Sequence, residues 1–197
     1  MTREACFTPS HARHHRVMDT LRGQLLLAGA GIFSATFRQT VVLLAEHDET
    51  SALGFVVNRP SGLIAAEAAG ELARLPLPDP RIFLGGPVQP GAVAIVGEFE
   101  REDFAGNPIF GSVGMLGAGP DGVSAEGVTR AKVFSGYAGW GPGQLENELD
   151  EGAWVIEDAR PEDVFTENPD RLWRDVLRRK GGEFVMLSTM SADPTAN

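Results

Sequence analysis

Residues 37–62 read FRQTVVLLAEHDETSALGFVVNRPSG, and this stretch predicts the type of fold. The apolar run at 40–48 is typical of a buried strand that ends in charged residues. Residues 51–57 predict a further strand. It should stop at Asn58-Arg59-Pro60, because proline cannot continue a hydrogen-bonded ladder and keeps the residue before it out of the helical region. The fold is therefore expected to be built on buried strands.

A glycine-rich segment before these strands is similar to a dinucleotide-binding motif. It reads GAGIFS at 29–34, after a predicted strand Gln24–Ala28, and the acidic residues Glu46 and Asp48 follow at the next strand end. Such a site needs parallel strands joined by a crossover of a dozen or more residues. Only about seven residues separate Gly31 from the next strand. We therefore interpret the segment as a tight connection between neighbouring strands.

The remaining chain predicts short strands and helices. A surface helix is expected at 63–75, and strands at Arg81–Leu84, 92–98, 110–116, 131–136 and 183–187. One helix should have Pro142 in its first turn and end at Gly152. Another should start at Asn168-Pro169, end in basic residues before a glycine, and bury Leu172, Trp173, Val176 and Leu177. No repeat or linker interrupts this order, so a single α+β domain is predicted.

Composition narrows the class of protein. The chain has 197 residues, 43% of them apolar, which is enough for a buried core. The single Cys6 allows no internal disulfide, and the apolar run at 25–33 is too short to cross a membrane. Without a recognisable leader, a cytoplasmic location is expected. We divide the chain into a flexible arm at 1–22, a domain at 23–190 and a tail at 191–197.

The charge of −10 is concentrated in the last third of the chain. Residues 146–175 contain eleven acidic residues and three arginines, a balance of −8. Dense negative charge repels phosphate backbones, so direct nucleic-acid binding is not expected. An acidic helical face could instead meet a basic protein partner.

Several residue types with catalytic potential have two interpretations each. His47, the one histidine beyond the arm, is either a proton carrier or a hydrogen-bonded turn residue. Arg59, after Asn58, either clamps an anion or ends a strand in an ion pair. Residues 85–91, GGPVQPG, lack the Lys-Ser/Thr of a phosphate loop, and Ser135 does not match a nucleophile elbow. The sequence therefore predicts no catalytic set, no cofactor site and no metal site.

Glycine-bracketed aromatic residues form the last candidate. Tyr137 and Trp140 lie in GYAGWGPGQLE, just before a predicted helix that carries Gln144 in its first turn. Free backbone N–H groups there could receive an anion or a carbonyl. Alternatively, Trp140 packs into the core and the glycines permit the bend.

Taken together, five segments between about residues 23 and 179 resemble the AlgH/YqgE family. They are GQLLLAG, residues 37–62, FLGGPVQPG, FSGYAGWGPGQLENELDEGAW and LWRDVLRR. The resemblance implies a mixed, mostly antiparallel sheet, partly barrel-like, with flanking helices. It implies no established activity, although some members are linked to transcriptional regulation of alginate synthesis. The family's characteristic positions correspond to His47, Asn58, Pro60, Gly85, Gly86, Gly136, Tyr137, Gly139, Trp140, Gln144 and Glu148.

Two functions follow as hypotheses. The preferred one is a non-enzymatic binding or regulatory module whose candidate cleft contains His47, Asn58, Arg59, Tyr137, Trp140 and Gln144. The alternative is an enzyme for a small anionic substrate, with His47 as acid/base and Arg59 as anion clamp. The alternative requires His47, Arg59 and Gln144 to share one pocket.

Overall fold

The structure, a computed structural model, describes residues 20–31, 36–119 and 122–190. Most of the expected arm and the whole expected tail lie outside these ranges, as do residues 32–34 of the GAGIFS segment. The described part begins with Thr20, whose hydroxyl donates a hydrogen bond of 3.1 Å to the His47 carbonyl.

One ten-stranded sheet organises the described part of the chain. Its first half contains β1 (Gln24–Ala28), β2 (Val41–His47), β3 (Ala52–Val56) and β12 (Trp154–Asp158). Its second half contains β4 (Pro60–Ile64), β5 (Arg81–Leu84), β6 (Val88–Phe99), β7 (Asn107–Phe110) and β8 (Val113–Met115). The long strand β11 (Val128–Trp140) belongs to both halves, and β9 (Ala118–Gly119) pairs separately with β10 (Gly122–Val123).

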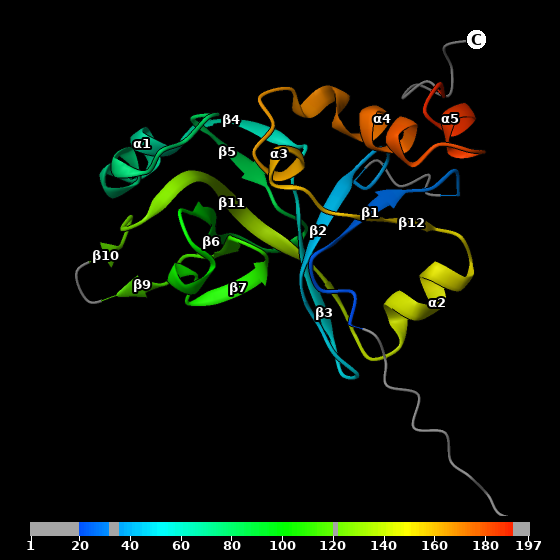
Figure 1. Ribbon diagram of the computed structural model, residues 1–197, viewed down its shortest axis with the longest axis horizontal. Coiled ribbons are helices and arrows are strands. Elements are labelled where there is room, and N and C mark those ends of the chain that lie inside the picture. The colour runs from blue at the N-terminus through cyan, green and yellow to red at the C-terminus, as the bar shows by residue number, and fades with distance from the viewer. Residues whose placement is uncertain (1–19, 32–35, 120–121, 191–197) are drawn as a thin grey trace, which may run out of the picture.

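The main path runs β12-β1-β2-β3-β11-β6-β8-β7, with β5 beside β11 and β4 beside β5. Among these pairs only β5–β11 is parallel. The sheet curls in its second half (Figure 1). The predicted single α+β domain with a mixed, mostly antiparallel and partly barrel-like sheet is confirmed. Because β1 and β2 are antiparallel neighbours, the GAGIFS segment does not lead into a parallel crossover unit.

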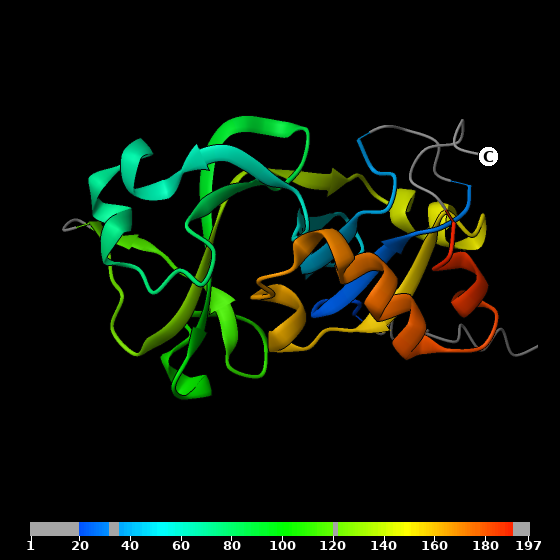
Figure 2. The ribbon, with the colours of Figure 1, turned by 90° about the horizontal axis from the view of Figure 1, so that it is seen from above.

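Helices cover the first half of the sheet on both faces. On one face α3 (Pro161–Val164) and α4 (Pro169–Lys180) pack over Leu25, Leu27 and the alternate residues of β2 (Figures 1 and 2). On the other face, α2 (Gln144–Asp150) inserts Leu145 against Leu26, Val42 and other strand residues that alternate with those on the first face. Burial of both faces explains why β1 and β2 are continuous apolar runs rather than alternating ones.

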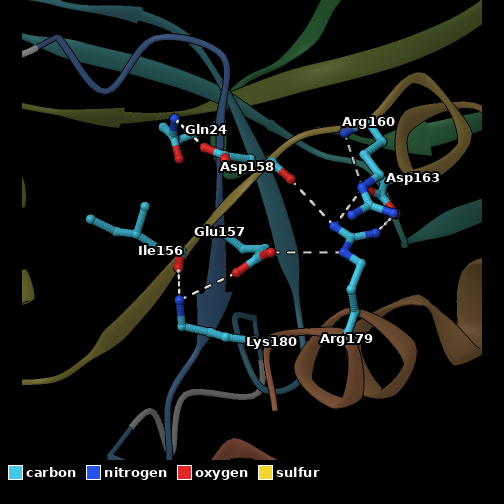
Figure 3. Close-up of polar contacts among 8 residues, drawn as sticks. All are labelled: Gln24, Ile156, Glu157, Asp158, Arg160, Asp163, Arg179 and Lys180. Carbon is cyan, nitrogen blue, oxygen red and sulfur yellow. Dashed lines mark hydrogen bonds and ion pairs between the residues drawn. The ribbon is translucent and has the colours of Figure 1, made fainter.

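The long helix α4 has the predicted bounds and the predicted buried stripe. Its C-terminal end is tied to α3 and to β12 by charged side chains (Figure 3). Arg179 donates two hydrogen bonds to the carboxylate of Asp163 (2.7 and 2.8 Å), and Lys180 donates to the Ile156 carbonyl (2.8 Å) and to Glu157 (3.2 Å). Cations at the negative end of the helix dipole therefore also hold the neighbouring edge strand.

Several predicted elements were wrong in type or extent. Residues 184–187 form a helix, α5 (Phe184–Leu187), rather than a strand. Gly181 and Gly182 have positive φ angles and turn the chain back, so Phe184 and Leu187 pack against the core one helical turn apart.

The expected helix at 63–75 is split into α1 (Ala65–Ala68) and a 3-10 turn, η1 (Gly70–Arg74), after β4. The expected strand at 110–116 is a hairpin of β7 and β8. A second 3-10 turn, η2 (Glu102–Phe104), lies between β6 and β7.

The shared strand β11 bends at Gly136, where its register with β6 shifts. Gly136 has a φ of +70°, and a Cβ on Gly85 would lie 2.2 Å from its carbonyl oxygen. Gly85 also donates its N–H to Ser135 (2.9 Å) and accepts a hydrogen bond from the Val56 N–H (2.9 Å). The two halves of the sheet are therefore joined by backbone groups that pack without side chains between them.

We expect Gly85→Ala to lower the free energy of unfolding by about 3 kcal/mol, because the methyl group would overlap the backbone of β11. Gly91→Ala, in the same glycine-rich segment, is the matched control, since nothing lies within 4 Å of a Cβ there. Urea denaturation of both variants measures the difference. Equal stability of the two variants would contradict the close packing.

Lys132, in β11, is the buried cation of the second half, 2% exposed. Its Nζ donates to the Val57 carbonyl (3.1 Å) and lies 3.9 Å from the centre of the Phe83 ring. Burial lowers the pKa of Lys132 to about 7, although Asp79 opposes the shift. The unfolded chain therefore binds a proton that the folded chain has lost when the pH lies between about 7 and the ordinary value of 10.5.

The free energy of unfolding should consequently rise with pH across that window, by at most about 1.4 kcal/mol per pH unit. Lys132→Met should remove the rise, whereas Lys180→Met should keep it. Chemical denaturation at a series of pH values between 7 and 10 tests this. A rise that persists in Lys132→Met would assign it to another group.

Candidate functional site

The site is built where β11 ends and α2 begins. After Trp140 the chain turns at residues 141–143, and Gly143 adopts a φ of +70°. The side chain of Gln144 accepts a hydrogen bond from the Gly141 N–H (3.2 Å), which closes the turn. The helix begins at Gln144, two residues later than Pro142 suggested, and buried Leu145 fixes it to the sheet.

Glu148 connects α2 to two strands. One of its carboxylate oxygens accepts hydrogen bonds from the indole N–H groups of Trp140 (2.8 Å) and Trp154 (2.7 Å). The other oxygen accepts one from the Gln144 amide (2.9 Å). Both indoles are 6% exposed, so the carboxylate satisfies two buried donors that would otherwise be unpaired. One side chain thereby fixes the relative positions of β11, β12 and α2.

A cavity of about 450 Å³ opens beside this cluster. Its wall includes three aromatic rings, with Trp154 in edge-to-face contact with both Trp140 (centroids 6.1 Å apart, 77°) and Phe37 (5.7 Å, 82°). Pro87 adds to the apolar wall, and Gln144 and Glu148 provide its polar groups. The cavity thus combines aromatic surface with one carboxylate. We call it the tryptophan cavity.

His47 interacts with another residue of α2, Glu146, and lines a separate cavity of about 480 Å³. The Leu21 N–H donates to its Nδ1 (3.0 Å), so this nitrogen carries a lone pair and the ring proton is on Nε2. Nε2 donates that proton to the Glu146 carboxylate (2.9 Å). Both ring nitrogens are therefore occupied by contacts within the protein, and the side chain is 4% exposed.

Three of the other predicted residues also have structural contacts. Asn58 accepts a hydrogen bond from the Val41 N–H (2.9 Å) and donates one to the Gln39 carbonyl (2.9 Å), so it replaces a backbone pairing at the start of β2. Arg59 donates to the carbonyl of Arg38. Tyr137 packs against the main core cluster.

The six predicted cleft residues are not brought to one pocket. Trp140 and Gln144 line the tryptophan cavity, His47 lines the second cavity, and Arg59 lines neither of them. Arg59 is also absent from a third cavity, of about 520 Å³, around Phe99 and Phe104. The shared pocket of His47, Arg59 and Gln144 that the enzymatic alternative requires is therefore not found among these cavities.

Sequence reasoning did not place Trp154, Phe37 or Glu148 in the cleft. The spacing of Glu148 one helical turn after Gln144 is a local signal that places both on one face of α2. No local sequence signal places Trp154 in the cavity, because its position depends on the pairing of β12 with the distant strand β1.

Two further observations concern the described residues only. No three histidine, cysteine or acidic side chains gather there at a point that could hold a metal ion. None of the helices in the described ranges is both long and apolar enough to cross a membrane.

Comparison with known proteins identifies the family. A family model described as AlgH-like matches residues 25–185. The chain belongs to the AlgH-like family. A UPF0301 protein of Streptomyces coelicolor is 38% identical over 187 residues, with 91% of this chain and 97% of that protein covered. A UPF0301 protein of Mycobacteroides abscessus is 34% identical over 188 residues, with 89% and 87% covered.

Two solved structures are similar in fold to this chain. A crystal structure of a Corynebacterium diphtheriae protein has a TM-score of 0.77 and 27% identity, covering 85% of this chain and 91% of that one. The solution structure of the AlgH protein from Pseudomonas aeruginosa has a TM-score of 0.64 and 29% identity, covering 88% and 96%. The names of these relatives assign no activity, so function has to be argued from the site.

The contact between His47 and Glu146 predicts an acid-sensitive contribution to stability. The hydrogen bond from His47, followed by one from the backbone of Glu146, lowers the pKa of the Glu146 carboxyl below its ordinary value of 4.5. This contribution is complete above that value and is lost as the pH falls through the lowered folded-state pKa. Glu146 is 34% exposed, so it amounts to about 1 kcal/mol or less.

Glu146→Gln should therefore flatten the loss of stability with falling pH in the range below about 4.5. Glu151→Gln, an exposed carboxylate just after the same helix, should leave the profile unchanged. Thermal unfolding between pH 3 and 6 measures both. An unchanged profile in Glu146→Gln would show that the contact does not stabilise the fold.

Proposed function

We propose that this AlgH-like protein is a non-enzymatic cytoplasmic module that binds a basic segment of a partner protein. The partner would meet the α2 face, which we define as the exposed acidic end of α2, Asp150 and Glu151, together with the adjacent tryptophan cavity. The observation that carries the proposal is the contrast between His47, whose ring nitrogens are both occupied, and this cavity, which is open beside an acidic helix.

The charge distribution of α2 supports this proposal. The helix has no basic residue in its last turn, where cations would favour the negative end of the helix dipole. Asp150 and Glu151 are instead exposed at that end. In α4, by comparison, three basic residues occupy the last turn and two of them bind acidic side chains of neighbouring elements. Within the described ranges, no basic residue in the last turn of α2 compensates the negative charge of the α2 face, which a cationic partner would neutralise.

Some members of the family are linked to the regulation of alginate synthesis. A binding module could take part in such regulation through the partner protein that it binds. A chain with a net charge of −10 is repelled by phosphate backbones. We accordingly expect no binding to duplex DNA at physiological salt, and propose that any regulatory effect passes through a protein bound at the α2 face.

The test compares immobilised full-length protein in three forms exposed to a lysate of the organism that produces it. The wild type and the control Glu67→Gln/Glu71→Gln should retain the same basic protein. Asp150→Asn/Glu151→Gln, with an identical change in net charge, should lose it. Retention should also fall at about 1 M salt, where the Debye length is about 3 Å. Indistinguishable captured proteins from all three forms would contradict the proposal.

A further inference from the structure

The tryptophan cavity has a chemical character that suggests its occupant. Aromatic rings of Phe37, Trp140 and Trp154 contribute to its wall, and among the described residues that line it Glu148 is the single charged one. No arginine, lysine or histidine of the described ranges lines it. Aromatic faces attract cations through their negative quadrupole, and this attraction grows when the site excludes water. An anionic group would meet like charge there.

The charge of Glu148 is satisfied by hydrogen bonds but not neutralised. Its three donors, two indoles and one amide, are all uncharged. No ion pair to Glu148 occurs within the described ranges, whereas the acidic side chains Glu157 and Asp163 in Figure 3 are paired with Arg179 or Lys180. A carboxylate offers about four acceptor positions, so about one remains for a ligand.

The cavity wall is also held in place before any ligand arrives. The two indoles are fixed by the shared carboxylate, and Trp154 is packed between Trp140 and Phe37. Binding would therefore require little reordering of side chains, which lowers the entropic cost of association.

We propose that the tryptophan cavity binds the guanidinium group of an arginine side chain on the partner protein. The arginine would donate one hydrogen bond to Glu148 and place its planar group against the indole surface. Arginine suits this site better than lysine because the guanidinium is less strongly hydrated and stacks on aromatic rings. This inference rests on the proposed function, and it specifies the residue of the partner that enters the cavity.

The test uses the purified full chain and N-acetyl-arginine amide, with N-acetyl-citrulline amide as the uncharged analogue of nearly the same shape. Binding is followed by the NMR signals of the indole N–H groups. The chain has three tryptophans, and Trp173, which donates its N–H to the Ala28 carbonyl, is not among the residues that line the cavity. We expect the arginine probe to shift the Trp140 and Trp154 signals and leave the Trp173 signal in place, and the citrulline probe to bind at least about tenfold more weakly.

Glu148→Gln, which keeps an acceptor for the indoles and removes the charge, should weaken arginine binding by about tenfold or more. Glu146→Gln changes the charge of the same helix outside the cavity and should bind within about twofold of the wild type. Thermal unfolding confirms that each variant is folded. Equal binding of arginine and citrulline, equal binding by wild type and Glu148→Gln, or binding of tetramethylammonium but not of the arginine probe would each overturn the inference.

The outcome separates this inference from the proposed function. If a basic protein is captured through Asp150 and Glu151 but the arginine probe leaves the indole signals unchanged, the partner binds the acidic face without entering the cavity. The inference then fails and the proposed function stands.

Discussion

A single strand, β11, belongs to both halves of the sheet, and it can bend between them only where side chains are absent. At that point the backbones of Gly85 and Gly136 approach so closely that a methyl group on either would overlap the other segment. Residues 128–135 of β11 pair with β6, and Tyr137 pairs with Val88 of the same strand after the register shift. Ser135 also pairs with Leu84 at the end of β5. Residues 138–140 pair instead with β3. Beyond the bend, Ala138 and Trp140 belong to the core cluster that Leu145 of α2 also enters.

The candidate site forms at the end of β11 that pairs with β3. The Trp140 side chain contacts Trp154 of β12, although β1, β2 and β3 lie between β11 and β12 in the sheet, and the residues after Trp140 turn into α2. Glu148 then reaches back from the helix to both tryptophans. The same carboxylate therefore stabilises the fold and supplies the charge of the tryptophan cavity. A substitution at this position alters both, which is why a charge-removing replacement that keeps an acceptor is more informative than a truncation.

Sequence reasoning succeeded where the determining interactions are local. The helix α4 was predicted correctly because its first proline, buried stripe and basic end all lie within its own twelve residues. Residues 184–187 were misassigned because a short apolar run fits a strand or a helix equally well. The strand β12 was missed because its partner β1 lies more than a hundred residues earlier. The tryptophan cavity could be predicted only in part, because it requires β11, β12 and α2 to converge.

The positions that carry the family resemblance can now be given physical roles, and most of those roles are structural. Gly85, Gly86 and Gly136 permit close backbone packing, and Asn58 replaces a backbone pairing. His47 links α2 to the start of the described chain. Asn58 and His47 thus have hydrogen-bond partners within the fold. Trp140, Gln144 and Glu148 differ, because they hold one another in place and also line an open cavity. These three residues hold one another in place and leave a charged, aromatic cavity beside them, and that geometry is the basis of the binding role proposed above.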